Sequence, residues 1–497
     1  MRDREVVAAE RTLGPDPVTD GVDGRHRAGA VAHAGERHDT AGDETGAGAG
    51  DRGAAQDHVD AHGGVVLVLG ASGFIGRHLV GLLVARGFHV IAGVRRPEGA
   101  NMAGISEYRA VDFARMTEAA AWRPVVAGVD AVVNLVGMFR ENAAATFDAV
   151  QHAAPAALAE ACEAGCVRRV VQMSALGAND KAATAFLRTK RAADEALLAR
   201  RLDAVVVQPS LVYGEDGASS ALFRVLASMP CVALPRGGVD AVQPVHVDDV
   251  VAAIAALLRA PPGRYSGRRL VLAGPEPLPL RAYLAQLRAG MRVPGRLYVL
   301  PLGTRLARIM AGVAGRLPGS LVSRDAFDML AQGNTAPDNA VSKLLRRPPR
   351  APADFVAPAH ADMLRTAAVL GWMAPLLRAS VALLWIVTAA VSFGLYPVAD
   401  SFALLARAGV PEVMRPPALY GAALLDLLLG VLTLWPHRPR WLWRAQMALI
   451  VGYTVIISLR LPEFWLHPYG PLTKNLPLLG LLWFLDRVER ARWTTSR

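Results

Sequence analysis

The first 62 residues of this 497-residue chain contain almost no large apolar side chains. They are rich in Ala, Gly, Asp, Arg and His, and they lack the apolar stretch of a secretory signal. Such a segment buries too little apolar surface to offset the conformational entropy lost on folding. We therefore expect residues 1–63 to be a disordered extension, or else the product of a start codon assigned too far upstream.

The chain is also poor in cysteine and in runs of basic residues. Its three cysteines, Cys162, Cys166 and Cys231, form neither a disulfide framework nor the paired CxxC spacing of a zinc site. The formal net charge is +11, but no Lys-rich run or basic strip with interleaved aromatics is present. We expect a reducing compartment, no metal and no nucleic-acid partner.

From Val65 onward, short apolar runs alternate with helical segments. The runs Val65–Leu69 and Phe88–Val94 flank a helix predicted over Phe74–Ala85, and three further runs follow at 130–136, 168–173 and 203–208. Strands that are apolar on both faces and are separated by helices indicate a parallel sheet covered on both sides. We predict an α/β doubly wound Rossmann fold over residues 64–356, in which residues 210–356 form a small substrate lobe.

A Pro/Ala/Arg-rich linker at 344–360 precedes a C-terminal region with four long apolar stretches. Tryptophans gather at the ends of these stretches, as in an interfacial aromatic belt, which argues against the alternative of a buried soluble bundle. We predict an all-α four-helix transmembrane domain at 357–497, with spans at about 380–395, 417–435, 441–459 and 471–484.

Arginine is unevenly distributed among the connections between these stretches. The second connection and the C-terminal tail are richer in arginine than the first and third connections, and they include Arg438, Arg440, Arg487 and Arg490. Because basic residues favour the cytoplasmic side, we expect a multi-pass protein of the cell inner membrane. Both termini and the Rossmann domain would then be cytoplasmic.

The run VVLVLGASGFIGRHLV at 65–80 reads as a strand, a glycine-rich turn and the start of a helix. Gly70 permits a tight turn, Gly73 lets the backbone approach a pyrophosphate, and Gly76 lets helix and strand pack closely. The amino end of the helix then offers free N–H groups to the phosphates. The predicted phosphate-binding residues are Gly70, Ala71, Ser72, Gly73, Phe74, Ile75 and Gly76.

Arg95 and Arg96 follow the second strand, where a domain that prefers NAD usually carries an acidic residue. Arginine at this position can pair with a 2′-phosphate, and the alternative is that both are solvated loop charges. We expect NADP as the cofactor, with NAD as the alternative. Asp112, after the next strand, is the candidate partner of the adenine.

The chain over about 64–356 resembles the atypical and extended short-chain dehydrogenase/reductases, in particular the branch that includes an accessory subunit of respiratory complex I. The resemblance rests on GASGFIG (70–76), NLVG (134–137), SALGA (174–178), FLRTK (186–190), QPSLVYG (208–214) and QPVHVDDVV (243–251). It implies that Val136, Gly137, Pro209 and Lys190 line the cofactor.

The same resemblance implies a catalytic Ser, Tyr and Lys, the last two spaced YxxxK. Ser174 and Lys190 stand at the Ser and Lys positions, but Phe186 replaces the Tyr. Phenylalanine has no proton to give, and loss of a general acid costs roughly 10²–10⁴-fold in rate. Tyr213 is the candidate replacement acid, and the alternative is that it only packs.

The C-terminal region resembles the DoxX-like family of small four-helix membrane proteins, on ALYGAALLDLLLG (418–430) and WLHPYGPLTKNLPLL (465–479). Asp426 lies within an apolar segment, where a carboxylate is costly unless it is paired or protonated. Lys474 is its candidate partner. A structural role in helix packing and a role in transport or at a quinone site both stay open.

Three hypotheses follow. The first is an NADP(H)-dependent oxidoreductase or epimerase-type enzyme acting on a lipid or quinone. The second is a nucleotide-binding sensor or assembly factor of a membrane complex, with little or no turnover. The third makes the membrane module the working part, a carrier or redox-partner subunit regulated by the nucleotide domain and working with other membrane subunits.

Overall fold

The computed structural model describes residues 63–105, 107–316, 324–331, 333–436, 438–468 and 470–495. All of the elements below belong to one unit, Asp60–Arg497. The predicted disordered extension lies, apart from Gly63, outside the described residues.

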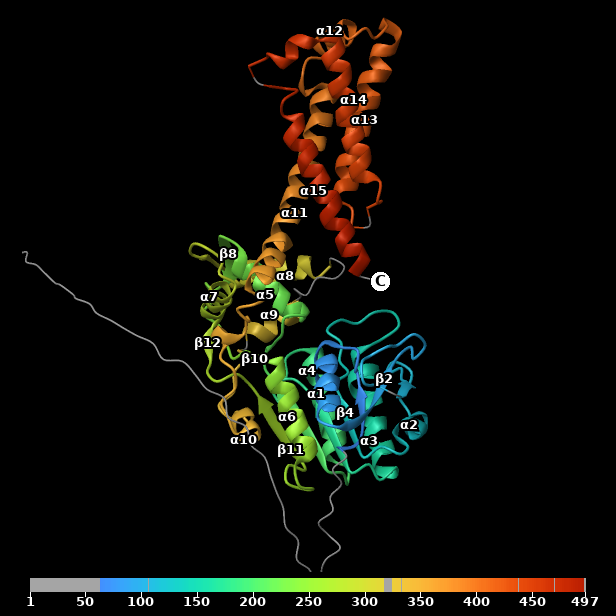
Figure 1. Ribbon diagram of the computed structural model, residues 1–497, viewed down its shortest axis with the longest axis vertical. Coiled ribbons are helices and arrows are strands. Elements are labelled where there is room, and N and C mark those ends of the chain that lie inside the picture. Colours follow the sequence, from blue (N-terminus) through green and yellow to red (C-terminus); the bar gives the residue numbers. More distant parts are fainter. Residues whose placement is uncertain are drawn as a thin grey trace, which may run out of the picture. The chain divides into compact units, whose positions relative to one another are not determined.

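A parallel sheet of seven strands forms the centre of the N-terminal half (Figure 1). Its strand order is β11-β6-β5-β4-β1-β2-β3. The order reverses at β1, which pairs with β2 on one side and with β4 on the other, and a ligand crevice forms at such a point. The strands are β1 Gly63–Leu69, β2 Phe88–Val94, β3 Glu107–Ala110, β4 Ala131–Asn134, β5 Arg169–Met173, β6 Ala204–Pro209 and β11 Arg268–Leu272.

Helices cover both faces of this sheet because its central strands carry apolar side chains on both faces. One hydrophobic cluster joins the sheet to α1 and α6, and a second cluster joins its other face to α2, α3 and α4. The covering helices are α1 Phe74–Ala85, α2 Ala119–Val126, α3 Ala154–Ala164, α4 Ala185–Leu198, α6 Val247–Arg259 and α10 Val341–Leu345. The predicted doubly wound fold is confirmed.

A smaller lobe is built between β6 and the C-terminal helices. Its cluster of buried residues includes Tyr213, Leu234, Tyr283, Phe355 and Leu364. Its described residues form three short two-stranded sheets, four α-helices and a 3-10 helix, Pro352–Asp354. Its elements are β7 Val212–Tyr213, α5 Ala218–Ser228, β8 Cys231–Pro235, β9 Ala241–Val242, β10 Val245–His246, β12 Leu278–Pro279, α7 Leu280–Gly290, β13 Tyr298–Leu302, α8 Thr304–Ala314 and α9 Arg324–Ala331.

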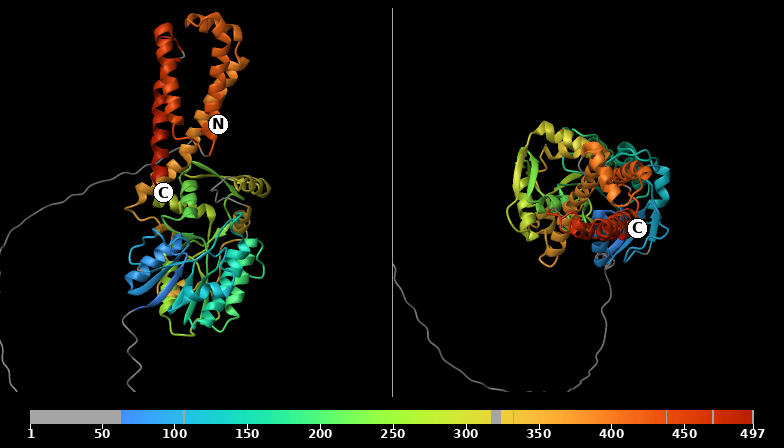
Figure 2. Two further views of the ribbon diagram at one scale, coloured as in Figure 1. Left: turned by 90° about the vertical axis from the view of Figure 1, so that its right-hand side faces the viewer. Right: turned by 90° about the horizontal axis from the view of Figure 1, so that it is seen from above.

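The C-terminal region is helical, and its long helices run side by side (Figure 2). Within the described residues, three helical segments are long and apolar enough to cross a membrane, at Ala361–Leu395, Glu412–Leu434 and Leu442–Arg460. The stretch predicted as a fourth span falls in α15, which is not among them because charged residues begin at Asp486. The helices are α11 Ala361–Ala390, α12 Val398–Arg407, α13 Arg415–Leu434, α14 Leu442–Arg460 and α15 Asn475–Thr495.

The first of these helices begins well before the span expected at about residue 380. α11 is continuous from Ala361 to Ala390, and its first turns belong to the lobe, since Leu364 and Ala368 lie in the same cluster as Tyr283. Gly371 lies against α5, because a Cβ added there would approach the Val225 side chain to 2.5 Å. One helix therefore packs into the lobe at its start and continues as the first apolar segment.

A buried carboxylate joins three of the long helical segments at one end of the helical region. Glu489 of α15, 4% exposed, accepts hydrogen bonds from both Arg438, at 2.8 and 2.9 Å, and the indole Nε1 of Trp443, at 2.9 Å. Arg378 of α11 lies 3.1 Å from the same carboxylate. Two guanidinium groups and an indole thus replace the water that this charge loses on burial.

We predict that Glu489→Ala strongly destabilises the helical region, because it removes the buried carboxylate that two partly buried cations share. Breaking a buried ion pair costs about 3–5 kcal/mol. The purified protein in detergent should therefore unfold at a clearly lower temperature in a thermal scan. The matched control is Glu463→Ala, which removes the exposed ion pair with Arg407 and should cost only about 0–1 kcal/mol. Equal shifts for the two variants would contradict this account of Glu489.

Candidate functional site

In the glycine-rich turn between β1 and α1, the backbone at Gly70 lies in close contact with the backbone of the first turn of α1 at Gly76. Gly70 has a φ of +79°, and its carbonyl accepts the N–H of Gly73 at 2.9 Å. A Cβ on Gly76 would lie 2.1 Å from that carbonyl oxygen, so no larger residue fits there without displacing the turn. The predicted turn residues Gly70, Ala71, Ser72, Gly73, Phe74, Ile75 and Gly76 therefore lie together at this end of the sheet.

The amino end of α1 has the chemistry that a phosphate group needs. Gly73 caps the helix in an extended conformation without any side-chain cap, and the first turn contains no acidic residue. The N–H groups at this end of the helix are thus not satisfied by a cap, and the helix dipole adds a positive potential. The turn fits the pyrophosphate of a dinucleotide.

Arg95 and Arg96 directly follow β2, the strand next to β1, and both are exposed. Asp112 follows the neighbouring strand β3 and holds local contacts: its carboxylate accepts the N–H of Ala114 at 3.1 Å and lies 3.6 Å from Arg115. The role of the two arginines in binding a 2′-phosphate stays a prediction. Asp112 is half-exposed at the same sheet edge.

Lys190 reaches from α4 to the carboxyl ends of two strands. Its ammonium donates to the carbonyl oxygens of Val136 and Met173, each at 3.0 Å. A Cβ on Gly137 would lie 3.3 Å from the same Nζ, so a side chain there would press on the ammonium. Val136, Gly137 and Lys190 are therefore brought together. Pro209 ends β6 at the same sheet edge, where its carbonyl accepts the N–H of Leu176.

Ser174 and Asp194 form a buried pair beside Lys190. The hydroxyl of Ser174 donates to Asp194 Oδ2 at 2.5 Å, and the other carboxylate oxygen, Oδ1, has no hydrogen-bond partner. Burial lowers the pKa of Lys190 to about 8 and raises the pKa of Asp194 to about 6. Sequence reasoning missed Asp194, although its position one helical turn after Lys190 was the signal that could have found it.

Phe186 lies in an apolar group rather than among proton donors. Its ring stacks on Phe139 with centroids 5.2 Å apart and meets Phe147 edge-on at 6.1 Å. Phe186 is buried, whereas Phe139 is largely exposed. The side chain one helical turn before Lys190 thus gives the site an apolar wall.

Tyr213 is fully buried in the core of the lobe. Its ring stacks on Phe355 with centroids 4.8 Å apart, and its hydroxyl lies 3.5 Å from Arg224 Nη1. Burial raises the pKa of this phenol. These contacts favour packing over proton transfer, and the role of replacement acid stays a prediction.

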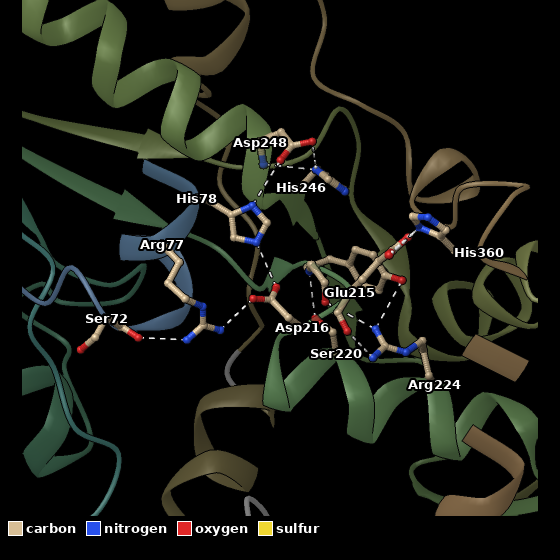
Figure 3. Close-up of polar contacts among 12 residues, drawn as sticks. Ser72, Arg77, His78, Glu215, Asp216, Ser220, Arg224, His246, Asp248 and His360 are labelled. Atoms are coloured by element: carbon tan, nitrogen blue, oxygen red, sulfur yellow. Dashed lines mark hydrogen bonds and ion pairs between the residues drawn. The ribbon is translucent and has the colours of Figure 1, made fainter. Parts of the chain in front are cut away.

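Charged groups link the amino end of α1 to the lobe, as Figure 3 shows. Asp216 accepts from Arg77 at 2.8 Å and contacts His78 Nε2 at 3.0 Å. Partial burial acts to raise the pKa of Asp216, but the contacts with His78 and Arg77 outweigh this effect and hold that pKa below its usual value. Beside them, Glu215 contacts His360, the residue just before α11, at 2.8 Å. Sequence reasoning missed this network, because its members are far apart along the chain.

Asp426 of α13 is 4% exposed, and its Oδ1 has no hydrogen-bond partner. Lys474, its predicted partner, is exposed, and no ion pair joins the two within the part of the chain that is described. Nearby, Trp385 donates to Gln446, which donates to Thr433. Among the described residues, no cluster of three or more His, Cys, Asp or Glu could hold a metal ion.

Two family models match separate parts of the chain. Residues 70–261 match an NAD(P)H-binding family, and residues 382–483 match the DoxX-like family. The first match contains the glycine-rich turn, Ser174 and Lys190, and the second contains Asp426.

Curated relatives match the N-terminal half. An Arabidopsis thaliana protein, "NADH dehydrogenase [ubiquinone] 1 alpha subcomplex subunit 9, mitochondrial", is 32% identical over 43% of this chain and 54% of its own length. A Caulobacter vibrioides ceramide reductase is 29% identical over 40% of this chain and 62% of its own length. The chain thus spans less than two thirds of either relative.

A solved structure of an NADPH-dependent quinone oxidoreductase from Escherichia coli is similar over 59% of this chain and 98% of its own, with 18% identity and a TM-score of 0.48. The sheet, the glycine-rich turn and the two family matches agree on the organisation of the chain. It contains an NAD(P)H-binding domain and a C-terminal DoxX-like domain.

Proposed function

We propose that this protein is a membrane-anchored NADP(H)-dependent oxidoreductase that acts on a lipid-like or quinone-like substrate. The observation that carries the proposal is the buried constellation of Lys190, Ser174 and Asp194 at the carboxyl edge of the sheet. Three desolvated polar groups are costly to keep in a protein that only holds a nucleotide. Groups with shifted pKa values beside a dinucleotide turn are instead typical of an active site.

The reduction of a carbonyl or quinone also needs a proton for the substrate oxygen. Phe186, at the position of the usual tyrosine, cannot supply this proton. A bound nicotinamide dinucleotide would supply or accept the hydride. Within the chain, the hydroxyl of Ser174 is hydrogen-bonded to Asp194, so the pair can hold a proton and exchange it with the substrate oxygen. In this proposal Lys190 holds the ribose, and its charge favours the ionised state of Asp194.

An apolar substrate suits the walls of this site. Phe186, Phe139 and Phe147 form an aromatic group beside Lys190, and Phe139 is 75% exposed. The apolar helices of the DoxX-like domain tie the same chain to a membrane, from which a lipid or quinone could be drawn. The similarity to a ceramide reductase favours a lipid. The inner membrane, with the nucleotide domain on its cytoplasmic face, is the location that we propose from the arginine distribution.

A second candidate function is a nucleotide-binding subunit without turnover that senses or stabilises a membrane complex. Two observations favour it: the stacking of Phe186 where a phenol would act, and the burial of Tyr213. The similarity to a complex I subunit adds that other membrane subunits are candidate partners. Both functions require cofactor binding, and they differ in turnover.

Arg95 and Arg96 should set the preference for NADPH. In fluorescence titrations of the full chain in detergent, we expect NADPH to bind more tightly than NADH. The double variant Arg95→Ser/Arg96→Ser should lose roughly 10–100-fold in NADPH affinity, since hydrogen bonds to charged groups contribute about 1.5–3 kcal/mol. The control is NADH affinity, which should stay the same. A parallel loss for both cofactors would contradict the role of the arginines.

Cofactor affinity should also depend on the protonation of Lys190. Because burial holds its pKa near 8, the ammonium is lost between pH 7 and pH 9. If only the charged form holds the ribose, NADPH affinity falls about tenfold over that range. Lys190→Arg stays charged and should give a flat profile. An unchanged alkaline decline in that variant would assign the titration to another group.

Substitutions at Asp194 and Phe186 distinguish the two candidate functions. For an enzyme, Asp194→Asn should lower NADPH oxidation with a long-chain keto-lipid or a short-chain quinone by roughly 10²-fold while leaving NADPH affinity nearly unchanged. Phe186→Tyr should raise the rate or leave it unchanged. Tight NADPH binding without turnover in the unmodified protein and in Phe186→Tyr would favour the non-catalytic subunit instead.

A further inference from the structure

An amphipathic helix in the lobe leaves its apolar side uncovered. In α8, Leu306, Ile309, Met310 and Val313 are each more than half exposed, whereas Ala307 and Ala311 are buried. At 3.6 residues per turn, the four large side chains occupy an arc of roughly 100°, and the two alanines are centred about 130° around the helix from it. The helix therefore uses its small residues to pack on the lobe and turns its large apolar residues outward.

Basic residues border this apolar arc on one side. Arg305 lies beside the arc and is exposed, Arg308 lies on the far side of the helix from it, and Arg316 follows the end of the helix. Arg308 is held by Asp328 of α9 at 2.7 Å. An apolar face with arginines beside it is the composition of a helix that lies in the plane of a membrane interface. The arginine stems can lie along the acyl boundary while their charged groups reach the lipid phosphates.

The strand before α8 extends the apolar character of this unit. Tyr298 and Leu300 of β13 are 65% and 55% exposed. They pair with Cys231 and Ala233 of β8, which are exposed as well. A soluble surface rarely collects this many large apolar side chains within 16 residues unless something covers them.

The course of α11 indicates that a bilayer is within reach. Its residue Ala368 packs in the lobe, and Arg378 contacts Glu489 in the helical region. Ten residues of helix span about 15 Å, so the lobe is held close to the end of the apolar helices. This limit on distance favours lipid over a soluble partner as the occupant of the α8 surface.

We propose that α8 is an interfacial helix that inserts Leu306, Ile309, Met310 and Val313 into the headgroup region of the bilayer and contacts anionic lipid through Arg305 and Arg316. The lobe then has two attachments to the membrane, α11 and α8. The substrate side of the nucleotide domain is thereby held at the lipid surface. This inference does not depend on whether the protein turns over a substrate.

The test places a fluorophore on α8 in the full chain. In a Cys166→Ser/Cys231→Ser background, with Cys162 buried, Ile309→Cys carries the label in nanodiscs that contain anionic lipid. We expect strong quenching by lipids with a nitroxide near the headgroup and weaker quenching by a nitroxide at the end of the acyl chain. Ala121→Cys on α2, an exposed position, is the matched control and should not be quenched.

Two further outcomes would overturn the proposal. A label at Ile309→Cys that is shielded from aqueous iodide but not quenched by nitroxide lipids would mean that protein covers the helix, either a second copy or another subunit. A label quenched by iodide as strongly as the control would mean that the helix stays in water. As an independent readout, Arg305→Glu/Arg316→Glu should reduce the lipid quenching several-fold without lowering NADPH affinity.

Discussion

The contact between Gly70 and Gly76 determines where everything else in the nucleotide domain can lie. Because the carbonyl of Gly70 would be 2.1 Å from a Cβ on Gly76, α1 can approach β1 only with glycine there. That approach directs the amino end of α1 at the crevice where the strand order reverses. The other groups of the site, from Lys190 on α4 to Asp216 after β7, are arranged around this crevice.

Some buried charged groups of this protein are satisfied by partners that come from several segments of the chain. Lys190 uses two carbonyls that the sheet leaves free at its edge. Glu489 accepts hydrogen bonds from Arg438 and Trp443 and forms an ion pair with Arg378, and these three residues come from three different segments. Asp194 and Asp426 are different, since each keeps a buried oxygen without a partner. A desolvated carboxylate of this kind is costly, and its persistence is a reason to look for chemistry at both places.

Local patterns predicted much of this structure. The strand–turn–helix at 65–85, the apolar strands and the long C-terminal helices follow from periodicity and glycine placement, which act over a few residues. The sequence could not show that α11 starts in the lobe, because its first turns are less apolar and their packing on α5 is a long-range contact. The Ser174–Asp194 bond and the Asp216 network were equally hidden, because they join residues 20 or more positions apart. For Lys474 the sequence predicted a contact that the structure lacks. It was paired with Asp426 because the two charges are opposite and lie in the same region, but Lys474 is exposed and Asp426 is buried.

The continuity of α11 has a mechanical consequence. Many enzymes close over their substrate by a hinge motion of a loop or domain. Here the lobe shares one helix with the apolar segments, and Pro375 removes a backbone hydrogen bond between the lobe contacts and Arg378, so a hinge motion of the lobe alone would bend α11 near this proline. A motion that brings the sheet toward the lobe would leave α11 unbent. In such a motion the nucleotide-binding sheet would move, and the lobe would stay fixed to the apolar helices.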